Sequence, residues 1–91
     1  MFLEIVTPEA SIFQGDVDSV IVPGQDGEFQ MMNNHAAIVS LLQEGKVKIS
    51  GNIAIDEAYQ DKFTKEGDNN ILLIKSGTVE MNNNKIIILV D

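Results

Sequence analysis

The 91-residue sequence contains no cysteine, no arginine and no tryptophan. Without cysteine there is no disulfide framework, no thiolate metal site and no cysteine nucleophile, a composition that suits a reducing compartment. Fourteen acidic residues against six lysines leave a net charge of -8. Because nucleic acids and anionic membrane surfaces are bound mainly through lysine and arginine, neither is expected as a partner. A basic protein surface is the electrostatic complement.

Long hydrophobic runs are also missing. The longest uninterrupted one, Ile86–Val90, is far shorter than the roughly 20 residues that span a bilayer, so direct membrane insertion is not expected. The first residues, Met1–Thr7, include no basic residue and do not resemble a secretory signal, which favours a cytoplasmic location. With 44% hydrophobic residues the chain can build one core. We expect a single domain over residues 1–91 that is monomeric when isolated.

Alternation of apolar and polar residues predicts strands along most of the chain. Val47 and Ile49 fall on one face of such a strand, and Lys46 and Lys48 fall on the other. Short strands at close spacing, separated by turn signals, predict an all-β fold: an antiparallel β-sandwich of about eight to ten strands. The strands expected from pattern are 2–7, 11–14, 17–22, 28–31, 45–50, 71–74, 78–81 and 85–90.

The most distinctive stretch is Val20–Leu42. Its first part crosses Gly24–Gly27 between two strand-like runs, as a β-hairpin does. The only histidine, His35, follows, and then Ala36–Leu42 is apolar at every position except Ser40. Because side chains alternate between the faces of a strand, one face cannot bury all of this apolar surface. We expect part of it to meet a partner.

One segment, Ile53–Asn70, departs from the strand pattern. Tyr59 and Phe63 are four residues apart, as on one side of a helix, and Asp56 is a suitable N-cap. The sequence therefore predicts a short helix near residues 56–63, followed by a polar turn.

No set of residues makes an active site in this sequence. His35 has an imidazole suited to acid–base chemistry, but no nucleophile or orienting carboxylate can be assigned to it, which favours an interface role. Four acids between residues 16 and 28 lack the spacing of a calcium loop and fit a solvated rim better; a calcium-binding β domain is a weaker alternative. Gly24–Gly27 lacks the Lys-Ser/Thr of a phosphate loop. We predict no catalytic residue, no metal and no cofactor.

Several motifs follow one another in the order and spacing of one known family. They include a Pro-Gly-x-x-Gly-x-Phe turn, a His-Ala segment, a Leu-x-x-Gly and a final Gly-x-x-Glu-x-x-x-Asn strand pair. These stand at Pro23–Phe29, His35–Ala37, Leu42–Val47 and Ser76–Asp91, after an opening Leu3–Glu9 and Phe13–Gly15. In them the sequence resembles, over nearly its whole length, the N-terminal β-sandwich domain of the epsilon subunit of F-type ATP synthases.

The sequence departs from this family pattern in four respects. Gln30, Asn33 and Asn34 stand where the family has Gly after the Phe and Pro before the His. Ser76 replaces the first glycine of the family's Gly-Gly pair. The connection Ile53–Asn70 is longer than usual, which places an insertion there with the predicted helix in it. The family's C-terminal helical hairpin does not follow Asp91, so we expect either a naturally short form or a truncated one, without inhibitory helices.

The resemblance implies a non-catalytic subunit of the rotor in the central stalk. Such a subunit links the gamma subunit to the membrane c-ring, so that ion-driven rotation is coupled to ATP synthesis. The implied location is peripheral, at the cytoplasmic face of the bacterial inner (plasma) membrane. Carried over by motif, the c-ring-facing residues are Gly27, Glu28 and Phe29, and the gamma-facing residues are His35, Ser40 and Leu42.

Two further expectations follow. Without the family's C-terminal helices, the chain is expected neither to bind ATP nor to inhibit ATP hydrolysis. The alternative to the rotor subunit is an unrelated small acidic β-sandwich, acting as an adaptor or ligand-binding module, since one fold hosts many functions.

Overall fold

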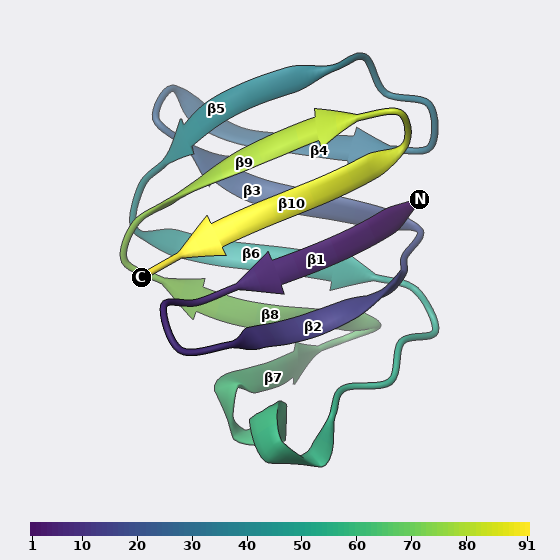
Figure 1. Ribbon diagram of the computed structural model, residues 1–91, viewed down its shortest axis with the longest axis vertical. Helices are drawn as coiled ribbons and strands as arrows, with labels where there is room; N and C mark the ends of the chain where they lie inside the picture. The colour runs from purple at the N-terminus through teal and green to yellow at the C-terminus, as the bar shows by residue number, and fades with distance from the viewer.

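The computed structural model describes all residues, 1–91, and contains ten strands and one short 3-10 helix (Figure 1). This confirms the predicted all-β fold with a single short helical element. The structure contains no helix with the length and apolar content needed to cross a membrane. The elements are β1 (Phe2–Val6), β2 (Ser11–Asp16), β3 (Ser19–Gly24), β4 (Gly27–Met32), β5 (Ile38–Leu42), β6 (Gly45–Ser50), η1 (Glu57–Lys62), β7 (Phe63–Glu66), β8 (Asn69–Ile74), β9 (Gly77–Asn82) and β10 (Lys85–Val90).

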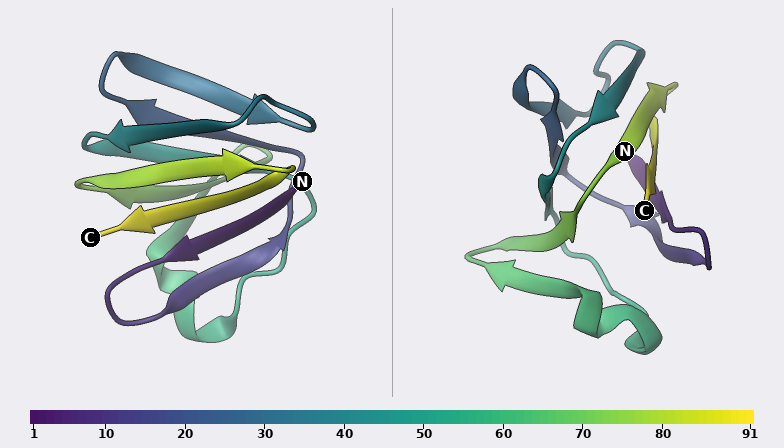
Figure 2. Two further views of the ribbon diagram at one scale, coloured as in Figure 1. Left: turned by 45° about the horizontal axis from the view of Figure 1, so that its top comes forward. Right: turned by 90° about the vertical axis from the view of Figure 1, so that its left-hand side faces the viewer.

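The strands form one sheet that curls over itself into two layers (Figures 1 and 2). One layer runs β2-β1-β10-β9-β5, and the other contains β3, β6, β8 and β7 with β4 paired to β3. A single pair, Gly24 with Leu42, joins the layers where β3 meets β5. Every pairing is antiparallel, as predicted, except that of β1 with β10, which is parallel. These two strands can run in the same direction because nearly the whole chain connects them.

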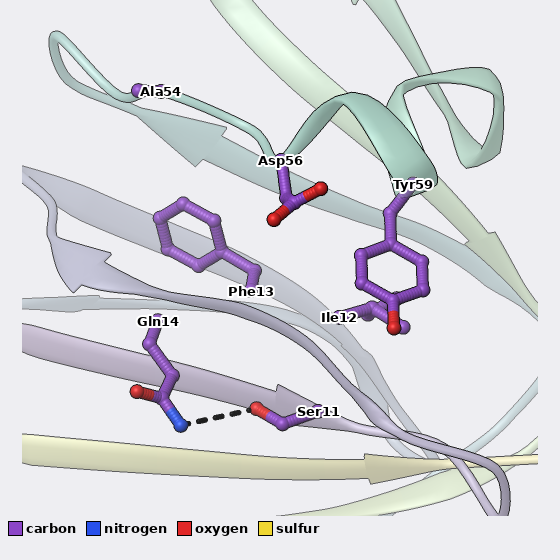
Figure 3. A pocket seen from close by; sticks show the side chains of 7 residues that line it. All are labelled: Ser11, Ile12, Phe13, Gln14, Ala54, Asp56 and Tyr59. Atoms are coloured by element: carbon purple, nitrogen blue, oxygen red, sulfur yellow. Dashed lines mark hydrogen bonds between the residues drawn. The ribbon is translucent and has the colours of Figure 1, made fainter.

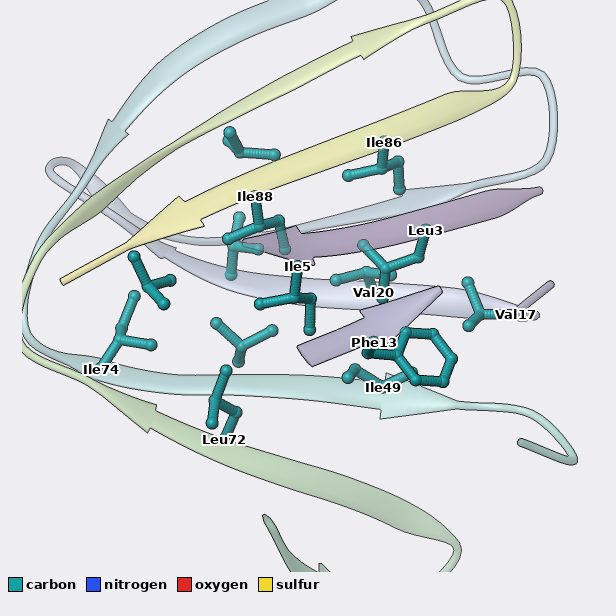
Figure 4. Close-up of a cluster of buried hydrophobic side chains, with 14 of the residues drawn as sticks. Leu3, Ile5, Phe13, Val17, Val20, Ile49, Leu72, Ile74, Ile86 and Ile88 are labelled. Carbon is teal, nitrogen blue, oxygen red and sulfur yellow. The ribbon is translucent and has the colours of Figure 1, made fainter. Parts of the chain in front are cut away.

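The core lies between the two layers (Figure 4). Leu3 and Ile5 from one layer meet Val47 and Ile49 from the other, and all four side chains are fully buried. Their neighbours in sequence face outward, and on β6 this confirms the alternation read from the sequence. Removing each such side chain from water contributes roughly 1.5–3 kcal/mol to folding. The burial of this one cluster holds the layers together.

The predicted insertion consists of an extended stretch, η1 and β7. The carboxylate of Asp56 accepts a hydrogen bond from the backbone N–H of Ala58 at 2.9 Å, which confirms Asp56 as the N-cap. The helix ends one residue earlier than predicted, because Phe63 is extended (φ -115, ψ 150) and lies opposite Leu72 as the first residue of β7. Strand β7 itself was not predicted. Its pairing with β8 is what brings the Phe63 ring into the core.

This segment closes one edge of the sandwich. In Figure 1 the helix η1 of this segment lies below β2 and β7. Ile53, Ile55 and Tyr59 pack, partly buried, against the core cluster. The edge strand β2 is thereby shielded on the side where it has no strand partner.

Candidate functional site

The outer face of the β5-β9-β10 layer carries exposed apolar side chains. Val39 and Leu41 on β5 are 76% and 56% exposed, and Leu89 on β10 is 50% exposed. The register places Leu41 beside Thr78 of β9, and Thr78 beside Leu89, so these side chains form a row on one face. We call Val39, Leu41 and Leu89 the apolar stripe. Large exposed apolar residues gathered on one face are typical of an interaction surface.

The apolar stripe explains the excess of apolar residues after the hairpin. Within β5, Val39 and Leu41 point outward, whereas Ile38, Ser40 and Leu42 alternate toward the interior. Leu42 is only 4% exposed and belongs to the core cluster. It therefore cannot present the gamma-facing surface that was predicted for it. Val39, Leu41 and Leu89 were not among the residues predicted for the site. Alternation separates Val39 and Leu41 from Leu42 along β5, but both faces of this strand are largely apolar, so the pattern does not tell which face is exposed.

The predicted hairpin forms between β3 and β4. Gly24 pairs with Gly27, and Gln25 and Asp26 make the connection between them. Gly27 has a φ of 121°, a backbone conformation that residues with a side chain rarely adopt. Glu28 follows on the exposed side, whereas Phe29 is partly buried against the core. Gly27 and Glu28 therefore lie at an accessible tip, and Phe29 anchors it.

Two ion pairs lie on the outer face of the other layer. The Nζ of Lys48 is 3.4 Å from the Glu28 carboxylate, and the Nζ of Lys46 is 2.7 Å from that of Glu66. The hydrogen bond and the positive charge from Lys46 lower the pKa of Glu66 below its ordinary value. This pair therefore adds stability at pH values above the ordinary carboxyl pKa, and loses it as the pH falls through the lowered pKa. Both pairs are solvent-accessible, which limits their strength.

Ser40 and His35 lie in different surroundings. A hollow of about 340 Å³ is lined by residues 24–29 of the hairpin together with Ser40, so Ser40 lies beside the residues predicted to face the c-ring. His35 is in the bend before β5, where its Nδ1 is 2.7 Å from the carbonyl oxygen of Ala36. The structure thus brings Ser40, in the middle of β5, beside the hairpin and leaves His35 in the bend before β5.

A second hollow, of about 260 Å³, lies between β2 and the segment that leads into η1 (Figure 3). The amide of Gln14 donates to the Ser11 hydroxyl at 3.3 Å and to the Glu4 carboxylate at 3.0 Å. The Asp56 carboxylate caps η1, and Tyr59 completes the wall. These polar groups largely bond to one another or to the backbone. Nowhere does the structure gather three histidine, cysteine or carboxylate side chains in a metal-binding arrangement.

The geometry therefore defines a class: small β-sandwich modules that offer an exposed apolar face rather than an enclosed catalytic pocket. Comparison with known proteins makes the class specific. The family model described as "ATP synthase, Delta/Epsilon chain, beta-sandwich domain" matches residues 1–91. The chain belongs to this family of ATP synthase chains, as its beta-sandwich domain, and is thus part of a non-catalytic subunit rather than an unrelated β-sandwich.

Individual relatives support this family assignment. The ATP synthase epsilon chain of Campylobacter concisus is 37% identical over 91 residues, which are 100% of this chain and 60% of that relative. That of Chlorobium limicola is 39% identical over 89 residues, 98% of this chain and 86% of the relative. A chain from the central stalk and c-ring of the Tetrahymena thermophila mitochondrial ATP synthase has a TM-score of 0.76 at 18% identity, covering 99% of this chain and 62% of that one. This last likeness concerns the fold.

Proposed function

We propose that this chain acts in the rotor of an F-type ATP synthase, where it links the gamma subunit to the c-ring and so couples ion-driven rotation to ATP synthesis. The observation that carries the proposal is the apolar stripe on a domain of this family. A sandwich with one apolar outer face and an accessible acidic tip can bind two partners at once. Such a domain transmits torque between them without any chemistry of its own.

The gamma subunit is proposed to dock on the apolar stripe. The row of Leu41, Thr78 and Leu89 continues to Val6 on β1, which widens the apolar face across β5, β9, β10 and β1. Burying each exposed leucine against gamma contributes up to roughly 1.5–3 kcal/mol to the binding free energy. The loss of translational and rotational freedom and the ordering of side chains oppose this gain. His35 lies just before β5 and extends this face toward the bend.

The c-ring is proposed to meet the hairpin tip at Gly27, Glu28 and Phe29, with Ser40 at the edge of the same hollow. Glu28 carries an accessible carboxylate that only Lys48 approaches within the chain, so it remains able to pair with a cationic side chain of a partner. We place the assembly peripherally, at the cytoplasmic face of a bacterial plasma membrane. The bacterial origin of the epsilon-chain relatives supports this location.

The proposal is tested by charge substitutions on the two outer faces. Leu41→Asp and Leu89→Asp place a carboxylate in the apolar stripe, while Leu73→Asp changes a leucine that is 69% exposed on the other layer. Binding to immobilised gamma subunit is measured for each variant. We expect the two stripe variants to bind about tenfold or more weakly, because an apolar anchor is replaced by a desolvated charge. Leu73→Asp should bind like the unmodified chain.

Two results would contradict the proposal. The first is gamma binding that is unchanged in both stripe variants. The second is an equal loss of binding in Leu73→Asp, which would show a general effect of added charge rather than a docking face. Circular dichroism and thermal unfolding of all three variants verify that each remains folded.

A further inference from the structure

The bend that carries His35 is tied to a turn about 50 residues away in the chain. The backbone N–H of Asn34 donates to the side-chain oxygen Oδ1 of Asn84 at 2.9 Å. In return, the side-chain nitrogen Nδ2 of Asn84 donates to Oδ1 of Asn33 at 3.5 Å. Asn84 belongs to the two-residue turn between β9 and β10. The side-chain amide of Asn84 therefore both accepts a hydrogen bond from the bend and donates one to it.

Both turns have asparagine at positions where the backbone φ is positive. Asn34 has a φ of 64° and is the third residue of a turn closed by the bond from His35 N–H to the Met32 carbonyl oxygen at 3.0 Å. Asn83 and Asn84 have φ values of 51° and 61°, as the two central residues of a type I′ hairpin do. Asparagine tolerates this left-handed conformation better than other residues with a side chain. Asn33 and Asn34 thus turn the chain where the family pattern has a proline before the histidine.

Asn84 is the point where three segments meet. Its backbone carbonyl oxygen accepts from Phe2 N–H at 3.1 Å, so the same residue holds the start of β1, the tip of β9-β10 and the His35 bend. The bend needs such an anchor because it crosses from β4, which pairs only with β3 in one layer, to β5 in the other. Asn83, its neighbour in the turn, makes no side-chain hydrogen bond of this kind.

We propose that Asn84 is a positioning residue for the gamma-facing surface: its side chain holds the His35 bend, and with it the start of β5, against the tip of β9-β10. This inference rests on the proposed docking of gamma at His35 and the apolar stripe. Asn84 itself need not contact the partner. Its hydrogen bond orders the bend before gamma binds. Less conformational entropy is then lost on association, which strengthens binding.

Three variants test this role. Asn84→Gly removes the side-chain amide and keeps a residue that accepts the positive φ. Asn83→Gly is the matched control, since it makes the same change at the adjacent position with a similar φ. Asn84→Asp keeps an oxygen acceptor for the Asn34 N–H. Hydrogen exchange of the Asn34 amide, followed by nuclear magnetic resonance, and affinity for gamma are measured for each.

In Asn84→Gly we expect exchange of the Asn34 amide to be about tenfold faster and gamma binding about three- to tenfold weaker, the effect of one lost hydrogen bond. Asn83→Gly should change neither, and Asn84→Asp should restore both. Equal gamma affinity of Asn84→Gly and Asn83→Gly would overturn the positioning role while leaving the rotor function intact. If the unmodified chain does not bind gamma at all, the proposed function fails and the positioning role falls with it.

Discussion

At the scale of single residues, Gly77 shows how closely the strands approach one another. It is the first residue of β9 and pairs with Val90 on one side and Leu42 on the other. A Cβ atom built at this position would lie 2.3 Å from the backbone carbonyl oxygen of Leu89. That oxygen belongs to a central strand and cannot move away cheaply. The family's glycine is kept here because no side chain fits, while the preceding position, Ser76, accepts one.

We therefore expect Gly77→Ala to lower the free energy of unfolding by about 1–3 kcal/mol, the usual cost of forcing an extra methyl group into a packed site. Urea denaturation followed by circular dichroism measures the change. Gly15→Ala is the control, because there the added Cβ would meet only the side-chain ring of Phe13, at 3.2 Å. Equal stability of the two variants would show that the β9–β10 contact relaxes readily.

At the scale of elements, the segment from Gly51 to Glu66 acts as a cover for one edge of the sandwich. Its helix η1 has no buried residue of its own. The segment is held instead by partly buried Ile53, Ile55 and Tyr59 and by the buried ring of Phe63. Phe63 is the only buried anchor among them, and the other three are partly buried. The cover should therefore depend mainly on that one residue.

For this reason Phe63→Ala is expected to destabilise the protein by about 3–5 kcal/mol, the range observed when a buried phenylalanine is truncated. Thr64→Ala changes the next residue of β7, whose side chain is exposed, and should alter stability by less than about 0.5 kcal/mol. Thermal and urea unfolding of both variants give the comparison. A small effect of Phe63→Ala would mean that the core can close without β7.

At the scale of the whole molecule, the two proposed binding surfaces lie on different parts of the sandwich. The apolar stripe is on the outer face of the layer that contains β5, β9 and β10, and the acidic tip belongs to the β3-β4 hairpin of the other layer. The layers are joined at Gly24 and Leu42, close to the tip. This arrangement allows the surfaces to be occupied together and altered separately.

We expect Glu28→Lys to weaken assembly with the c-ring, and to do so more at low salt than at high salt, because salt screens exposed charges. Gamma binding should be unchanged. The new lysine would also face Lys48, which now approaches Glu28 to 3.4 Å, so a local repulsion replaces an attraction. Capture on isolated c-rings at two salt concentrations measures the effect.

The control for this change is Glu57→Lys, which alters the net charge equally on η1, away from both proposed surfaces. If both variants bind the ring as the unmodified chain does, Glu28 is an ordinary surface acid. If both lose binding to the same extent, net charge rather than a contact at the hairpin governs assembly.

The sequence by itself determined most of the strands, most of the turns and the family, whereas β5 and β7 were not predicted as strands. Alternation along β6 placed Val47 and Ile49 on one face and Lys46 and Lys48 on the other, and the structure buries both apolar side chains in the core. The capping residue of η1 could be recognised because a cap acts on the backbone a few residues away. Local signals of this kind are complete within a short stretch of chain.

The tertiary structure alone decided which residues form the candidate site. Along β5 both faces are largely apolar, so the pattern could not tell that Leu42 faces the core and Leu41 faces solvent. The hydrogen bond between Asn34 and Asn84 joins residues 50 positions apart, a contact that no local pattern encodes. Surfaces and contacts between layers depend on how the sheet curls, and this is set by the packing of all its strands together.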